Sequence, residues 1–214
     1  MTTFHFIRHE ESEANVQAKL AHESGALRLD LPWYSSYDIP LSPAGFQRAK
    51  SLKCPPAQWV YCSPYKRAKQ TMLLSIPGSM SYREDGRLVD KHQGVFDRLS
   101  VEGMKVYHPD EWAKRLKLGK FYHRPFGGES WEDVARRIKS FMDDVVQIGW
   151  DTVLVFTHDV PILTAIYICG KMTPNEILGY QKRTPVKNGS ITTLIYEGED
   201  DASRARQDTV GASR

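Results

Sequence analysis

Three predicted strands end beside side chains that could carry out chemistry on a phosphate ester. These strands cover residues 2–7, 58–62 and 151–156. The side chains that follow them are Arg8 and His9, Ser63 with Arg67 one helical turn later, and His158. A neutral imidazole can attack phosphorus, and guanidinium groups bind the phosphoryl oxygens on which charge develops. The residue types therefore indicate phosphoryl transfer.

The elements that must position these residues follow from the hydrophobic pattern. Residues 151–156 form the near-continuous apolar run that is typical of a buried parallel strand, and residues 190–196 predict a fourth strand. Helices are expected from Ser63–Pro64 to about Leu74, after a capping box at Ser130, and over 160–169. The carboxyl ends of parallel strands meet in one crevice, so His9, Arg67 and His158 should lie together.

This alternation predicts an α/β fold, a three-layer sandwich with a mostly parallel central sheet and helices on both faces. Residues 20–45 and 86–128 are long and punctuated by glycine and proline, and we expect them to form lid insertions over the carboxyl ends of the strands. Residues 1–196 are predicted to form a single domain and residues 197–214 a disordered tail.

The commoner phosphate chemistries lack their motifs here. There is no P-loop and no G-x-G-x-x-G segment. Cys62 lies one residue too close to Arg67 for a cysteine phosphatase, and no aspartate pair follows the first strand. His5 and His9 have a helical metal-ligand spacing but lie on a strand, so no metal site is predicted. These exclusions leave histidine as the nucleophile.

Six segments, in order, resemble those of the histidine phosphatase superfamily, in its phosphoglycerate mutase-like branch. They span residues 3 to about 196, nearly the whole chain. They are Arg8–Asn15, Asp38–Gly45, Cys62–Thr71, Leu88–Gly94, Phe121–Ser130 and Phe156–His158.

The resemblance implies a role for each matching residue. His9 would be the phosphohistidine nucleophile, with Arg8, Arg67 and His158 forming the phosphate pocket. Asp90 would be the general acid and base, and Ser12 and Asn15 would contact phosphate or substrate. No cofactor is implied.

Two residues depart from the pattern of that branch, which usually has glycine at both positions. Glu10 would be strained if its backbone needs a positive φ, and its charge would repel a phosphate unless it points away. Asp159 directly follows the second histidine, where another branch places its acid, so it rivals Asp90 as the proton donor.

The composition indicates which classes of binding partner to expect. The net charge of +3 suits an anionic substrate and is too low for a nucleic-acid binder. Lys114, Arg115, Lys117 and Lys120 are expected to form a solvated helix face. No apolar run is long enough to span a membrane, and the three cysteines favour a reducing, cytoplasmic setting. The oligomeric state is not predicted.

The leading interpretation is a metal-independent phosphatase that hydrolyses small phosphomonoesters through a phosphohistidine. The segment Gly128–Ser130 and the residues that flank it resemble those of phosphatases more than those of mutases. The alternatives are a phosphoglycerate mutase-like phosphotransferase and a catalytically silent phosphate-binding regulatory module.

Overall fold

The computed structural model describes residues 1–33, 35–76, 78 and 80–198. Its strands are β1 (Thr2–Arg8), β2 (Trp59–Cys62), β3 (Tyr82–Glu84), β4 (Thr152–Thr157) and β5 (Ile191–Tyr196). Its α-helices are α1 (Glu13–Ser24), α2 (Pro43–Ser51), α3 (Lys66–Ser75), α4 (Val101–Tyr107), α5 (Pro109–Tyr122), α6 (Trp131–Ile148), α7 (Asp159–Cys169) and α8 (Pro174–Arg183). Two short 3₁₀ helices are η1 (Gly86–Leu88) and η2 (Gly94–Phe96).

The five strands form one sheet in the order β3-β2-β4-β1-β5, in which only β5 is antiparallel. In the parallel register of β1 and β4, Arg8 pairs with Thr157. The residues that follow them, His9 and His158, therefore lie side by side at the same edge of the sheet. The predicted convergence of these strand ends is confirmed.

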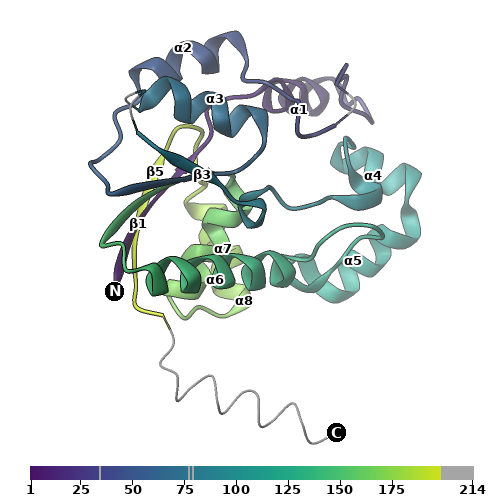
Figure 1. Cartoon of the computed structure of the whole chain (residues 1–214). Coiled ribbons are helices and arrows are strands. Elements are labelled where there is room, and N and C mark those ends of the chain that lie inside the picture. The colour runs from purple at the N-terminus through teal and green to yellow at the C-terminus, as the bar shows by residue number, and fades with distance from the viewer. Residues whose placement is uncertain (34, 77, 79, 199–214) are drawn as a thin grey trace, which may run out of the picture.

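Helices cover both faces of the sheet, as predicted. Phe4 and Phe6 of β1 point into a core built mainly from α6 and α7, whereas Ile7 points to the opposite face, against α3. Figure 1 shows α2 and α3 on one side of the sheet and α6, α7 and α8 on the other. Because side chains along a strand point alternately to the two faces of the sheet, β1 contributes to both cores.

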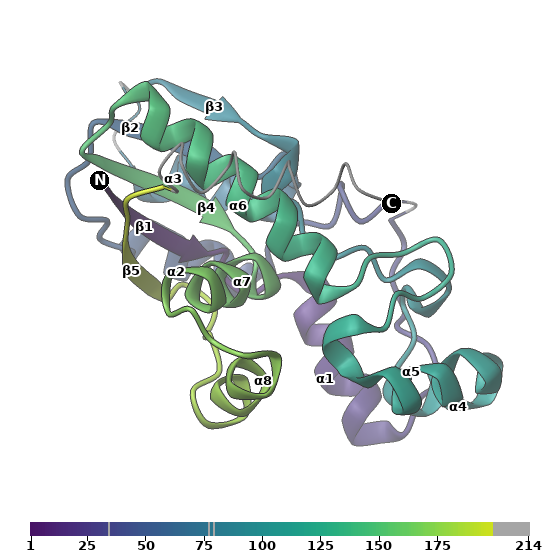
Figure 2. The ribbon, with the colours of Figure 1, turned by 90° about the horizontal axis from the view of Figure 1, so that it is seen from below.

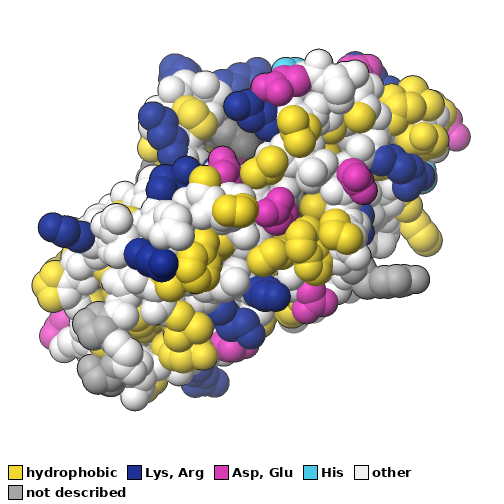
Figure 3. Space-filling view, turned by 90° about the horizontal axis from the view of Figure 1, so that it is seen from above, with side chains coloured by type: hydrophobic (Ala, Val, Ile, Leu, Met, Phe, Trp, Pro, Cys, Tyr) yellow, Lys and Arg dark blue, Asp and Glu magenta, His cyan; other side chains and the backbone are white. Residues whose placement is uncertain are grey.

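The helices α1, α4 and α5 lie beyond the sheet, on the side to which β1 runs (Figure 2). Helices α4 and α5 lie within the predicted insertion 86–128, whereas α1 starts before the predicted insertion 20–45 and only its end overlaps that segment. On the face seen from above α2 and α3, basic, acidic and apolar side chains are interspersed (Figure 3).

Most predicted boundaries hold to within a residue or two, and the Ser130 capping box opens α6 as expected. Two expectations need correction. β3 was not predicted, because its three exposed residues carry no apolar pattern. Helix α3 starts at Lys66 with Tyr65 at its N-cap, so the predicted capping role of Ser63 is wrong.

The extent of the domain stays a prediction, and residues 199–214 of the predicted tail lie outside the described residues. No helix of the described part is long and apolar enough to cross a membrane.

Candidate active site

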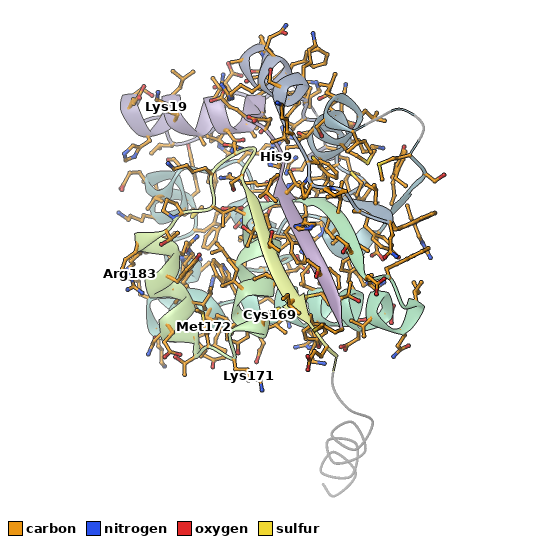
Figure 4. All side chains as sticks on the ribbon, turned by 90° about the vertical axis from the view of Figure 1, so that its left-hand side faces the viewer. His9, Lys19, Cys169, Lys171, Met172 and Arg183 are labelled. Atoms are coloured by element: carbon orange, nitrogen blue, oxygen red, sulfur yellow. The ribbon has the colours of Figure 1, made fainter. Side chains whose placement is uncertain are left out.

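His9 follows β1 directly and is 3% exposed. Its Nδ1 lies 2.6 Å from the carbonyl oxygen of Glu10, and because a carbonyl can only accept, Nδ1 must carry the ring proton. Its Nε2 receives the Nε–H of Arg67 at 3.2 Å. Burial and the charge of Arg67 hold the pKa of His9 well below 6.5. The ring is therefore neutral at pH 7, with a lone pair on Nε2. Figure 4 shows His9 at the end of β1, well separated from Cys169, the last residue of α7.

His158 ends β4 and is completely buried. Its ring centroid lies 5.0 Å from that of His9. Nε2 is 2.9 Å from the hydroxyl of Ser63, and Nδ1 has no hydrogen-bond partner among the described residues. Burial and Arg67 hold the pKa of His158 well below 6.5 as well, so two neutral imidazoles share the site.

Two guanidinium groups approach these rings. Arg67, on the first turn of α3, is 6% exposed and donates from Nη1 to the carbonyl of Ser36 at 2.9 Å. Arg8 donates from Nη1 to the carbonyl of Val186 at 2.6 Å, and its charge also lowers the pKa of His9. Its buried Nε has no partner among the described residues. Two fixed cations beside neutral imidazoles suit an oxyanion.

Asp90 faces this group from the loop after η1. Its Oδ2 lies 3.7 Å from Nη2 of Arg67 and 4.0 Å from Nδ1 of His158. Burial and the neighbouring carboxylate of Asp159 raise the pKa of Asp90, against the opposing charge of Arg67. A raised pKa favours the protonated form that a proton donor needs. Arg137 supports the loop by donating to the carbonyl of Asp90 at 3.2 Å.

Ser12 and Asn15 form the capping box that starts α1. The Ser12 hydroxyl donates to Oδ1 of Asn15 at 2.9 Å, so Ser12 is already engaged. Asn188 donates to the same Oδ1 at 3.3 Å and to the carbonyl of His9 at 2.9 Å. The side-chain NH₂ of Asn15 has no hydrogen-bond partner among the described residues and remains able to donate to an anion.

Comparison with known proteins agrees with this arrangement. The model of the histidine phosphatase superfamily (branch 1) matches residues 4–209. The chain belongs to the histidine phosphatase superfamily. The predicted family membership and fold class are thereby confirmed.

The following proteins are similar to this chain at low sequence identity. The bovine 6-phosphofructo-2-kinase/fructose-2,6-bisphosphatase 3 is 24% identical over 99% of the chain, which spans 44% of that protein's length. Phosphoserine phosphatase 1 of Hydrogenobacter thermophilus is 27% identical over 73% of the chain and 70% of its own. The alpha-ribazole phosphatase of Shigella flexneri has a TM-score of 0.72 at 18% identity, covering 90% and 89% of the two chains.

Glu10, which replaces a usual glycine of the family, does not disturb the phosphate end of the site. Its carboxylate accepts from Nε of Arg48 at 3.0 Å and so points toward α2. Among the described residues, the only non-glycine residues with positive φ are Arg98 and Lys171. The strain considered for Glu10 is therefore absent. Instead Gly189 has a φ of 68°, and a Cβ there would lie 2.1 Å from Oε1 of Glu10.

A cavity of about 630 Å³ adjoins the candidate active site, although His9 and His158 themselves do not line it. Arg67, Asp90 and Asp159 line it, together with residues of both predicted insertions. The lining outside this catalytic group is apolar at Leu29, Leu31, Phe96, Leu99 and Met104, and basic at Lys91, Arg98, Arg115 and Lys120. The described residues contain no cluster of three or more side chains that could hold a metal ion.

The expectation that four basic residues of α5 form one solvated face is wrong for two of them. Lys114 and Lys117 are exposed, whereas Arg115 and Lys120 line the cavity. Arg115 lies on a different side of the helix from Lys114 and Lys117, which are three residues apart. Gly119, with φ 80°, interrupts the helix and changes the direction of Lys120.

Thr71, Tyr65 and Asn188 of the site were not predicted, whereas Ser63 was singled out at its strand end but not as the partner of His158. Ser63 holds His158, Thr71 accepts from the backbone N–H of Glu10 at 3.0 Å, and Asn188 holds the carbonyl of His9. Tyr65 packs its ring 5.1 Å from that of His158. Ser63 and Tyr65 lie within the segment that carries Arg67, so their position could have signalled a role. Asn188 had no such signal, because it lies 179 residues from His9.

Proposed function

We propose that the protein is a phosphatase that hydrolyses small phosphomonoesters without a metal ion, through a phosphohistidine on His9. The observation that carries the proposal is the state of the His9 ring. A main-chain carbonyl holds the proton on Nδ1, while Nε2 faces the guanidinium of Arg67. A nucleophile needs this unprotonated nitrogen, and a phosphoryl group needs the adjacent cation.

In the first step, the hydrogen bond from Nε–H of Arg67 shifts from Nε2 of His9 to a phosphoryl oxygen of the substrate, which frees the lone pair. Nε2 then attacks phosphorus and forms an N–P bond as the ester P–O bond breaks. Arg67 and Arg8 bind the phosphoryl oxygens and stabilise the charge that spreads over them. His158, whose Nε2 contacts the Ser63 hydroxyl, can present Nδ1–H to one of these oxygens. The side-chain NH₂ of Asn15 would provide a further contact, and Ser12 would support it by holding Oδ1 of Asn15.

Asp90 would supply the proton for the departing alkoxide oxygen. The carboxylate that results would then accept a proton from water as the water oxygen attacks phosphorus. The N–P bond breaks, which releases inorganic phosphate and restores neutral His9. Asp159 would act through its charge, since it raises the pKa of Asp90.

Two observations favour hydrolysis over the alternatives. The relatives described above are named as phosphatases or carry a phosphatase activity in their names. Glu10, which together with Asp159 motivated the hypothesis of a silent module, is paired with Arg48 and points away from His9. It therefore does not neutralise the positive charges of Arg8 and Arg67 beside that ring.

The test is a rapid-quench experiment with p-nitrophenyl phosphate in the presence of EDTA. We expect inorganic phosphate to be released and His9 to gain one acid-labile phosphoryl group, detected by mass spectrometry after an alkaline quench. Conversion of 3-phosphoglycerate into its 2-isomer with little phosphate release would instead indicate a mutase. Binding of phosphate with no label on His9 would indicate the silent module.

A further inference from the structure

Four cationic side chains line the cavity outside the group of residues assigned to phosphoryl transfer. Arg98 is paired with Asp97 at 3.7 Å, which leaves Lys91, Arg115 and Lys120. Lys91 follows Asp90, whereas Arg115 and Lys120 come from α5. Lys91 is 6% exposed, and the other two are partly buried. Burying three cations on one cavity wall is costly unless negative charge compensates them.

The carboxylates near these cations act on them without direct contact. Burial and the charge of Arg115 outweigh them, although Asp90 and Glu129 raise the pKa of Lys91 and Asp159 raises that of Lys120. Within the described ranges, no carboxylate oxygen lies within 4.0 Å of the charged nitrogens of Lys91, Arg115 or Lys120. Lys91 contacts the amide oxygen of Gln93 at 3.3 Å, and Lys120 contacts that of Gln181. Neutral oxygens orient an ammonium group without cancelling its charge.

The three cations also act on one another. Burial and the charge of Arg115 lower the pKa of Lys91 to about 8, and Lys120 contributes to the same shift. Burial and Arg115 lower the pKa of Lys120. Mutual repulsion shows that the positive charges lie close together, and an anion between them would relieve it.

Arg67, by contrast, is engaged at the other part of the site, with His9 and with Asp90. Apolar side chains of the lid, among them Leu29 and Leu99, share the cavity with these charges. A ligand in this cavity would thus meet Arg67 with one anionic group, apolar walls with its body, and the α5 cations with a second anionic group.

We propose that the substrate is a phosphomonoester whose alcohol part carries a second anionic group, bound by Lys91, Arg115 and Lys120. This inference rests on the proposed phosphatase function and specifies its substrate class. A carboxylate and a second phosphate share the required chemistry. Each would form charge-assisted hydrogen bonds with the ammonium and guanidinium groups.

The test uses phosphorylated hydroxy acids of increasing chain length, each paired with its neutral amide, and the corresponding diol bisphosphates. We expect kcat/KM for the anionic member of the best pair to exceed that of the amide by about 10- to 100-fold, the effect of one or two charged hydrogen bonds. The acid and bisphosphate arms distinguish a carboxylate from a phosphate.

The ratio of the two kcat/KM values is then measured in Arg115→Gln/Lys120→Gln and in the matched control Lys117→Gln, an exposed lysine of the same helix. In the double variant this ratio should be at least about 10-fold lower than in the unaltered protein, whereas in the control it should be unchanged. Because both substrates are assayed on one preparation, partial misfolding does not change the ratio.

A ratio near one in the unaltered protein, or an equal ratio in the double variant, would overturn the second-anion site. Failure of the proposed function looks different. In that case no member of the panel releases phosphate and His9 carries no label.

Discussion

The two ends of the cavity are built in different ways. At the phosphoryl end, His9 and His158 are buried and fixed by contacts that come from three parts of the chain, at Glu10, at Ser63 and Arg67, and at Asn188. At the lid end, α4, α5 and the loop after them expose seven large apolar side chains. These are Val101, Val106, Tyr107, Leu116, Leu118, Tyr122 and Phe126.

The lid is joined to the loop before it by an antiparallel bridge between Arg28 and Leu99, with main-chain hydrogen bonds of 2.9 and 3.1 Å, and by the side chain of Arg98. Arg98 donates from Nη1 to the carbonyl of Leu31 at 3.3 Å and from Nη2 to that of Trp33. The backbone of Arg98 has a φ of 58°, a conformation that residues other than glycine rarely adopt. In the proposed function, the sheet would therefore fix the reacting groups, whereas the lid would select the substrate.

The largest expected effect lies at the phosphoryl end. Replacing His9 by alanine removes the nucleophile, so kcat for p-nitrophenyl phosphate should fall by about 10⁴-fold or more. The phosphohistidine label should disappear, while the circular dichroism spectrum stays native. Retained labelling would mean that another residue accepts the phosphoryl group.

The next effect separates the two carboxylates. Asp90→Asn removes the proton donor and should lower kcat by about 10²- to 10⁴-fold with a poor leaving group. Asp159→Asn should cost much less, and it should lower the pKa of Asp90 because a neighbouring negative charge is lost. The limb of the rate profile that requires protonated Asp90 then moves to lower pH. A larger loss in Asp159→Asn would exchange the two roles.

A smaller effect is expected at the lid. Arg98→Gly removes the two side-chain hydrogen bonds to the carbonyls of Leu31 and Trp33. Glycine adopts the same positive φ, so the substitution introduces no backbone strain. KM should rise by about 3- to 10-fold while kcat changes by less than about 2-fold. Steady-state kinetics measure both. An equal loss in kcat would show that the two ends are not independent.

The smallest effect concerns stability. The pKa values of His9 and His158 are held below 6.5 in the folded protein, so below that pH the unfolded chain binds more protons. Stability should therefore fall as the pH drops through 6.5 toward the folded-state values. Urea midpoints measure it, and the variant His9→Gln/His158→Gln should depend less on pH. An unchanged slope would show that other groups dominate.

The sequence predicts well what depends on strand ends. Parallel register alone carries His9 and His158 to the same edge, and the capping box at Ser130 marks the start of α6. Side-chain direction is harder to predict. The positive φ of Gly119 redirects Lys120, and no local pattern links Asn188 to His9. These features arise from tertiary contacts.

The hydrogen bond between the His9 ring and the peptide carbonyl next to it has a consequence for divergence. No side-chain replacement can delete that acceptor, so the reactive tautomer persists whatever residue occupies position 10. Relatives can then exchange their lids freely, and new specificities can arise without rebuilding the reactive nitrogen.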